Sequence, residues 1–277
     1  MLKQRVITAL VLFAIFVATL SAGSNWPFAG FTLALIAAAG WEWGRLNAAK
    51  GLSIAIGAVV AIIGAVALVL GWASFAPPAL WWLALLLWTL GGAWVLRAGV
   101  AAWGLHAAPV RWLLGVAILA LAWLAIVNAR GVGVNFLLST CCVVWMADIA
   151  AYFGGRAFGK RKLAPAISPG KSWEGVWSGM LGVLALAGVW LAVDRSFAVD
   201  SPSLFTHLRA RLALPGMALV LLFLAALSVV GDLFESLIKR SAGAKDSSQL
   251  LPGHGGVLDR FDALLPVVPA ALAFASL

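Results

Sequence analysis

The stretch LSIAIGAVVAIIGAVALVLGW, from Leu52 to Trp72, contains no acidic or basic residue and has about the 20-residue length that spans a bilayer as a helix. Similar uncharged runs extend from Val6 to Leu20, from Leu80 to Leu96 and from Gly216 to Val230. Of all 277 residues, 64% are hydrophobic and only 10% are charged, whereas soluble domains contain about 25% charged residues. This composition excludes a water-soluble domain and indicates helices that pair their own backbone groups in lipid.

The spacing of the apolar runs predicts the fold class. We expect an all-α, polytopic integral membrane helical bundle of about nine transmembrane helices, centred near residues 14, 35, 62, 88, 119, 143, 183, 223 and 270. The last predicted helix is short, so eight transmembrane helices are the alternative.

The basic residues predict the orientation. If the N-terminus is cytoplasmic, Arg130, Arg195, Arg209 and Arg211 are external, and the cytoplasmic segments hold Lys3, Arg5, Arg45, Lys50, Arg97, Arg111, Arg156, Lys160, Arg161, Lys162, Lys171, Lys239, Arg240, Lys245 and Arg260. This asymmetry follows the positive-inside rule, so the net charge of +9 reflects topology and predicts no nucleic-acid partner. Lys3 and Arg5, before an apolar run that ends at Ser21, also resemble a cleavable secretory signal, which is the alternative to a retained first helix.

Polar residues divide the chain into two regions of one continuous membrane domain. We predict a transmembrane scaffold over residues 1–130 and a catalytic transmembrane region over residues 131–277, with cytoplasmic loops 153–172 and 233–261. Glu42 lies alone near the end of the second predicted helix. Seven of the ten acidic residues lie at or beside the two loops: Asp148, Glu174, Asp232, Glu235, Asp246, Asp259 and Asp262. Carboxylates near membrane depth are costly unless they are paired or metal-bound, so this concentration predicts a functional site.

The first loop combines glycines with cations. Residues 154–160 fit the pattern GxxxxGK, but Arg161 replaces the Ser or Thr of an ATPase phosphate loop and a predicted helix precedes it, which excludes that motif. The loop can still bind phosphate through the charges of Arg156, Lys160, Arg161 and Lys162; an ordinary positive-inside loop is the alternative. Ser172 is expected to cap the next helix, whereas Lys171 beside a helix N-terminus is misplaced unless an anion binds there.

The second loop and the end of the helix before it read GDLFESLIKRSAGAKDSSQLLPGHGGVLDRFD over residues 231–262. If the helix continues through Arg240, one face carries Asp232, Glu235 or Ser236, and Lys239. Asp259 and Asp262 share a face at spacing i, i+3. Several carboxylates without cysteine favour Mg²⁺ over zinc, and the Lys and Arg side chains favour a polyphosphate substrate. His254 either contacts phosphate or hydrogen-bonds its own glycine-rich turn.

These residues resemble the phosphatidate cytidylyltransferase (CDP-diglyceride synthetase) family. Its signature has the form S-x-aliphatic-K-R-x4-K-D-x-small-x2-L-P-x-H-G-G-aliphatic-x-D-R-hydrophobic-D. The residues that match it without a gap are Ser236, Lys239, Arg240, Lys245, Asp246, Ser248, Leu251, Pro252, His254, Gly255, Gly256, Asp259, Arg260 and Asp262. The resemblance extends upstream to Asp148 and is only general in the first half of the chain.

The resemblance implies a reaction in which CTP and phosphatidate give CDP-diacylglycerol and pyrophosphate in phospholipid biosynthesis. It implies Mg²⁺ as cofactor, K⁺ as a second cation, and metal binding by Asp232 and Asp259, with Asp148 and Asp246 as further candidates. The catalytic set is Asp148, Lys171, Asp232, Lys239, Arg240, Lys245, Asp246, His254, Asp259 and Asp262. The substrate-binding set is Arg156, Lys160, Ser168, Lys171, Ser236, Lys239, Arg240, Lys245, His254, Gly255, Gly256 and Arg260.

The expected location is a bacterial inner (cytoplasmic) membrane, with the active site facing the cytoplasm, where a lipid and a soluble nucleotide can meet. The expected partners are CTP, phosphatidate and membrane lipids, and a homodimer is left open. Two other functions compete with this interpretation. One is a CTP-dependent polyprenol or phytol kinase, which would release CDP, and the other is an ion-coupled transporter, in which Asp148 and Asp232 would bind the ion.

Overall fold

The computed structural model describes residues 2–49 and 51–277, with side chains from Val6 onward. Lys50, one of the cations assigned to the cytoplasmic side, therefore lies outside the described residues, as do the side chains of Lys3 and Arg5. The helices are α1 (Leu2–Leu20), α2 (Trp26–Leu46), α3 (Ser53–Val69), α4 (Pro78–Leu86), the π-helical turn η1 (Leu87–Gly91), α5 (Gly92–Leu105), α6 (Ala108–Val132), α7 (Val134–Phe158), α8 (Trp173–Ser196), α9 (Leu204–Ser241), α10 (Leu258–Phe261) and α11 (Leu264–Ala275).

The fold is a helical membrane bundle, as the composition predicts. Within the described residues, five helical stretches are long and apolar enough to cross a bilayer: Pro78–Leu105, Ala108–Val132, Val134–Phe158, Trp173–Ser196 and Leu204–Ser241. Two shorter apolar helices cover Val6–Leu20 and Ser53–Val69. Each of the nine predicted centres falls inside a helix or, near residue 88, inside the π-helical turn.

The all-α prediction needs one correction. Strands β1 (Lys162–Ala164) and β2 (Ser168–Ser172) form a two-stranded antiparallel sheet between α7 and α8, with Lys162 opposite Ser172. Within the ranges of the two predicted loops, 153–172 and 233–261, α7 continues to Phe158 and α9 continues to Ser241. The last turns of α9 stay helical because they carry an apolar stripe that is buried in the bundle: Leu233, Phe234, Leu237 and Ile238.

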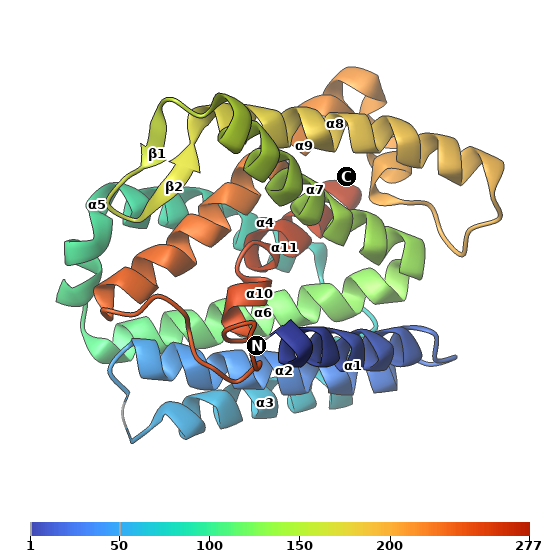
Figure 1. Cartoon of the computed structure of the whole chain (residues 1–277). Coiled ribbons are helices and arrows are strands. Elements are labelled where there is room, and N and C mark those ends of the chain that lie inside the picture. The colour runs from blue at the N-terminus through green and yellow to red at the C-terminus, as the bar shows by residue number, and fades with distance from the viewer. Residues whose placement is uncertain (1, 50) are drawn as a thin grey trace.

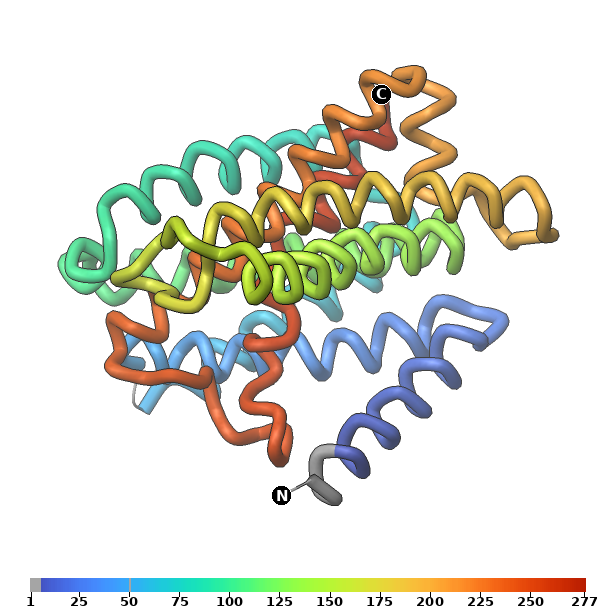
Figure 2. The backbone as a smooth tube through the Cα atoms, turned by 45° about the horizontal axis from the view of Figure 1, so that its top comes forward, coloured from blue at the N-terminus to red at the C-terminus, as the bar shows by residue number. Residues whose placement is uncertain are grey.

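The arrangement of the helices brings distant parts of the chain to one end of the bundle. Figures 1 and 2 show α1, α2 and α3 grouped on one side and α7 and α8 on the other. Helix α9 packs against α5, α7, α8 and α11. It changes direction at Ala213 (φ 54°), just before Pro215, whose ring cannot fit into a straight helix. Beyond this kink, α9 carries its charged last turns to the end of the bundle where the hairpin β1–β2 lies (Figure 1).

Candidate active site

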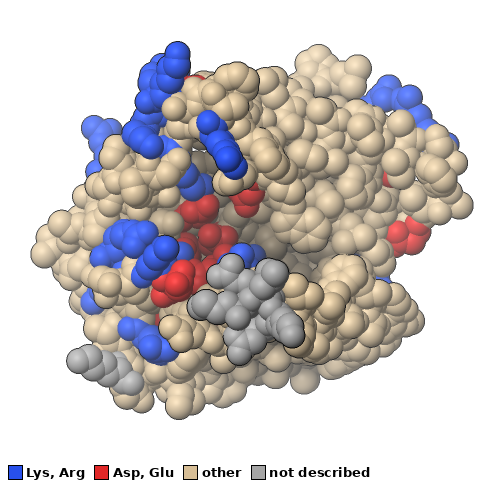
Figure 3. Space-filling view, viewed as in Figure 1, with Lys and Arg blue, Asp and Glu red and all other residues tan. Residues whose placement is uncertain are grey.

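A cavity of about 620 Å³ opens between the end of α7, the hairpin, the start of α8, the end of α9 and α10. Among its lining residues are eight that the sequence singled out: Asp148, Arg156, Ser168, Lys171, Asp232, Asp259, Arg260 and Asp262. Figure 3 shows acidic side chains inside a recess with Lys and Arg side chains around it. The two charged loops predicted from the sequence therefore meet at one cavity.

The hairpin positions Lys171 in this cavity. Strand β2 ends at Ser172, whose hydroxyl accepts a hydrogen bond from the Gly175 N–H at 3.2 Å, so Ser172 caps α8 as predicted. At the base of the hairpin, the Glu174 carboxylate accepts hydrogen bonds from the N–H groups of Lys160 and Arg161, both at 3.1 Å. Lys171 Nζ lies 2.6 Å from Asp232 Oδ2, so a carboxylate of the protein is one anion that stabilises a lysine at this helix N-terminus.

Close packing of α7 on α8 brings Asp148 to the same cavity. A Cβ at Gly179 would lie 2.7 Å from the Ala147 carbonyl oxygen, and a Cβ at Gly175 would lie 2.9 Å from that of Ala151. Glycine at these positions therefore permits an approach that any side chain would block. Gly154 likewise packs against Ser178, so it also permits the close contact between α7 and α8.

Asp262 is partly buried in the cavity near two other carboxylates. Burial of the Asp262 carboxyl, reinforced by the like charges of Asp232 and Asp148, raises its pKa to about 7. Asp262 Oδ1 accepts a hydrogen bond of 2.7 Å from the Ala263 N–H, and Lys239 lowers the pKa only in part. Three carboxylates from α7, α9 and the residue after α10 thus repel one another in a partly enclosed space, which favours binding of a cation.

Asp259 is held differently, because donors surround its carboxylate. Lys239 Nζ lies 2.7 Å from Asp259 Oδ1, and Ser247 Oγ and the Gly256 N–H donate to Oδ2 at 3.0 and 2.8 Å. Burial alone would raise the pKa of Asp259, but the hydrogen bonds from Lys239 and Gly256 outweigh it and lower the pKa to about 2. Lys239 also forms an ion pair with the buried Glu235 at 2.5 Å, so its charge is already shared between two carboxylates.

The loop between α9 and α10 wraps around a carboxylate that the sequence reasoning left out of the site. Glu42, in α2, is fully buried and accepts hydrogen bonds from both Ser247 and Ser248. A Cβ at Gly256 would overlap Ser247 and Glu42, and Gly255 has φ +83°, so this turn requires two glycines. The sequence did contain a signal for Glu42: it is a single acidic residue in an apolar helix, and ionisable residues inside membrane helices usually have a function.

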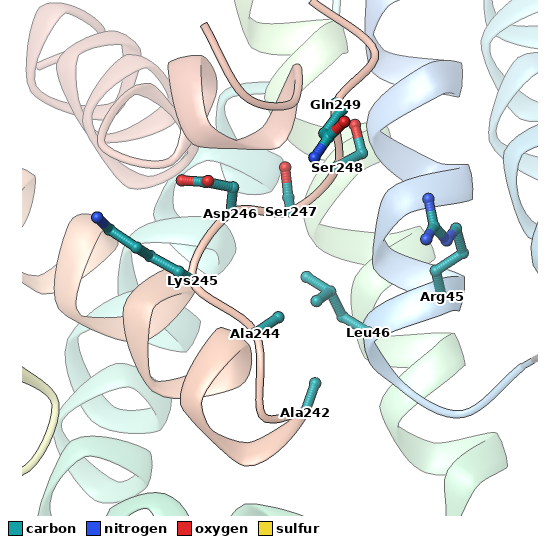
Figure 4. A pocket seen from close by; sticks show the side chains of 9 residues that line it. All are labelled: Arg45, Leu46, Ala242, Ala244, Lys245, Asp246, Ser247, Ser248 and Gln249. Atoms are coloured by element: carbon teal, nitrogen blue, oxygen red, sulfur yellow. The ribbon is translucent and has the colours of Figure 1, made fainter. Parts of the chain in front are cut away.

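Other predicted residues lie outside the carboxylate cavity. Lys245, Asp246 and Arg45 are among the residues that line a second cavity of about 570 Å³. In Figure 4, the side chains of Lys245 and Asp246 point away from Arg45. Arg240 donates to the carbonyl oxygens of Ile167 and Ala244, and so ties the hairpin to this loop.

Three further predicted residues have mainly local contacts. Ser236 donates to Asp232 Oδ1 at 3.3 Å, one turn earlier in α9. The side chain of Lys160 is exposed, and its backbone N–H makes the bond to Glu174. His254 binds Arg260 through its carbonyl oxygen, and its buried Nδ1 has no hydrogen-bond partner within the described part of the chain.

The cavity suits a hard divalent cation better than a soft one. Among the described residues, no group of three or more His, Cys, Asp or Glu side chains is placed so that it could hold a metal ion by itself. Mg²⁺ does not need one, because it is usually held by one or two carboxylates with water and substrate phosphates. Asp148, Asp232, Asp259 and Asp262 line the cavity with such oxygens, and hydrogen-bond donors already contact both oxygens of Asp232 and of Asp259.

Comparison with known proteins adds an independent finding. Residues 3–277 match the model of the cytidylyltransferase family. The chain is 41% identical to a phosphatidate cytidylyltransferase of Pseudomonas aeruginosa over 289 aligned positions, which cover 100% of this chain and 98% of that protein. Phosphatidate cytidylyltransferases of Haemophilus influenzae and Bacillus subtilis are 48% and 41% identical over 137 and 144 residues, which cover 44% and 48% of those proteins.

Proposed function

The chain belongs to the cytidylyltransferase family and is a nucleotidyltransferase, and we propose that it transfers the cytidylyl group of CTP to phosphatidate, giving CDP-diacylglycerol and pyrophosphate. The observation that carries this proposal is the cavity in which Asp148, Asp232 and Asp262 meet Lys171. The similarity to the Pseudomonas aeruginosa protein over the whole chain supports the same substrates.

The proposed topology places this cavity at the cytoplasmic face of a bacterial inner membrane. Nine helical segments cross the bilayer, and the N-terminus is cytoplasmic. The support is that cations concentrate at the end of the bundle that holds the cavity, as the positive-inside rule requires of a cytoplasmic end. A lipid can then enter from the membrane while the nucleotide enters from water.

The reaction needs positioning and charge more than a protein nucleophile. The phosphate of phosphatidate, with a second pKa of about 6, is already an anionic nucleophile at neutral pH. Lys171, Arg156 and Arg260 line the cavity and are placed to hold phosphate groups there. Their role is to align the lipid oxygen with the α-phosphorus of CTP and to stabilise the charge that passes to pyrophosphate.

The metal assignment is part of the proposal. One or two of Asp148, Asp232 and Asp262 would hold Mg²⁺ together with water and substrate phosphates, while Asp259 organises the loop and Asp246 lies in the second cavity. Bound Mg²⁺ would supply positive charge that reduces the repulsion between the phosphate oxygens of phosphatidate and those of CTP. Participation of K⁺ and assembly as a homodimer stay predictions from the sequence.

The decisive test is turnover by purified protein in detergent micelles, with α-³²P-labelled CTP, phosphatidate and Mg²⁺. Labelled CDP-diacylglycerol with stoichiometric pyrophosphate is expected, and chelation with EDTA should abolish it. Release of CDP in the presence of a polyprenol would indicate the kinase instead. Ion flux in liposomes without CTP turnover would indicate a transporter.

A further inference from the structure

Glu42 lies in the half of the chain predicted to be scaffold, yet it contacts the loop between α9 and α10 through both of its carboxylate oxygens. Oε1 accepts from Ser248 Oγ at 2.5 Å and from the Val257 N–H at 2.9 Å. Oε2 accepts from the Leu258 N–H at 2.7 Å and lies 3.0 Å from Ser247 Oγ, whose single hydrogen it shares with Asp259. Because burial of a carboxylate is costly, four donors of this kind are what make the position tolerable.

The same loop is bound from its other side by Asp259. Ser247 Oγ lies 3.0 Å from Glu42 Oε2 and 3.0 Å from Asp259 Oδ2, so one hydroxyl stands between the two carboxylates. The N–H of Gly256 binds Asp259, and the N–H of the next residue, Val257, binds Glu42. The turn is therefore fixed by two carboxylates that come from opposite ends of the sequence.

We propose that Glu42 is a positioning residue of the reaction: by holding residues 247–258 against α2, it sets the place of Asp259 and Arg260 at the cavity. Glu42 itself does not line the cavity, so it acts through the loop and touches no substrate. The inference rests on the proposed function for its kinetic readout. A residue of the first half of the chain would then support the active site, a role that neither the family signature nor the prediction of a scaffold over residues 1–130 includes.

The contacts predict how substitutions should behave. Each oxygen of Glu42 accepts one backbone N–H, so Glu42→Gln would place its amide NH₂ against a backbone donor in either orientation of the amide. The serine hydroxyls can rotate, but the N–H groups of Val257 and Leu258 cannot. Glu42→Asp keeps the charge on a side chain that is shorter by one methylene group, so it should restore part of the activity.

Asp194 provides a matched control at the opposite end of the bundle. Its carboxylate also accepts hydrogen bonds from uncharged donors, namely Asn135 Nδ2, the Ser203 N–H and the hydroxyls of Ser203 and Thr206. Asp194→Asn should therefore lower the thermal midpoint without changing kcat. This comparison separates a local effect on the active loop from a general loss of stability.

The experiment compares wild type, Glu42→Gln, Glu42→Asp and Asp194→Asn in detergent, using CTP turnover and amide hydrogen exchange. For Glu42→Gln we expect kcat to fall about 10- to 100-fold, with KM for CTP changed far less, because displacement of a supporting group by about 1 Å can cost 100-fold. Exchange should accelerate at residues 247–258 and stay unchanged in α7 and α8. Wild-type kcat in this variant, or accelerated exchange throughout the chain, would overturn the proposal.

A second variant keeps the test decisive if Glu42→Gln does not fold. Ser247→Ala removes the hydroxyl between the two carboxylates and leaves the other three bonds to Glu42, so an intermediate loss of kcat is expected. Wild-type kcat in Ser247→Ala would then overturn the proposal. If wild type itself shows no CTP turnover, the proposed function fails, and local exchange at residues 247–258 alone decides whether Glu42 holds the loop.

Discussion

Asp262→Asn is expected to make the metal-free protein more stable while removing activity. The pKa of Asp262 is about 7 in the folded protein and 3.8 for an ordinary aspartate. A carboxyl with a raised pKa contributes stability that is fully present below pH 4 and is lost as the pH rises through 7. The difference between the two pKa values corresponds to about 4 kcal/mol at pH 8 and about 2 kcal/mol at pH 5.

The asparagine keeps the side-chain oxygen that accepts the Ala263 N–H, so the substitution removes charge and little else. In EDTA at pH 8, the thermal midpoint of Asp262→Asn should exceed that of wild type by on the order of 10 °C. The gap should shrink by about half at pH 5 and also close on addition of Mg²⁺ at pH 8. An equal or lower midpoint for the variant at pH 8 in EDTA would refute the reasoning that Asp262 is electrostatically strained.

Other substitutions test the rest of the site. Lys171→Met should lower kcat about 10- to 100-fold, because it removes a cation whose side chain is 25% exposed and therefore only partly screened by water and salt. Lys171→Arg keeps the charge and should lower kcat less. Equal turnover of labelled CTP by the two variants would count against a role for the charge. Asp232→Asn should raise the Mg²⁺ concentration needed for half-maximal turnover, and an unchanged Mg²⁺ titration would exclude it as a ligand. Gly256→Ala should displace its loop and reduce turnover, whereas Gly188→Ala, where a Cβ meets no atom within 4 Å, should change neither turnover nor thermal midpoint. Ser172→Ala should cost about 1 kcal/mol through loss of the α8 cap, seen as a thermal midpoint lowered by about 2–4 °C.

Much of the fold follows from local pattern. Uncharged runs locate the helices, because a chain in lipid has few other ways to pair its backbone. The continuation of α9 through Arg240 follows from the apolar spacing, which also places Ser236 one turn after Asp232. The hairpin β1–β2 does not follow from local pattern. Strand β1 has three residues and β2 has five, and neither strand alternates apolar and polar residues.

The site is predictable in membership more than in roles. The structure places Asp259, Arg260 and Asp262 of the signature at one cavity. Spacing treats Asp259 and Asp262 alike, whereas their surroundings give their carboxyls pKa values of about 2 and about 7. That difference arises from the burial of Asp262 among like charges and from the Lys239 and Gly256 N–H donors of Asp259, and the spacing of the two aspartates does not encode it. Glu42 was missed for the same reason, because its partners lie more than 200 positions away.

The bonds of Glu42 also bear on how the protein is made. They join positions separated by 205 to 216 residues, so they can form only when almost the whole chain has left the ribosome. Until then, helix α2 holds a carboxylate with none of its final donors in place. Contacts of such long range form late and slow folding. A chain stopped before residue 247 therefore lacks all four donors to Glu42.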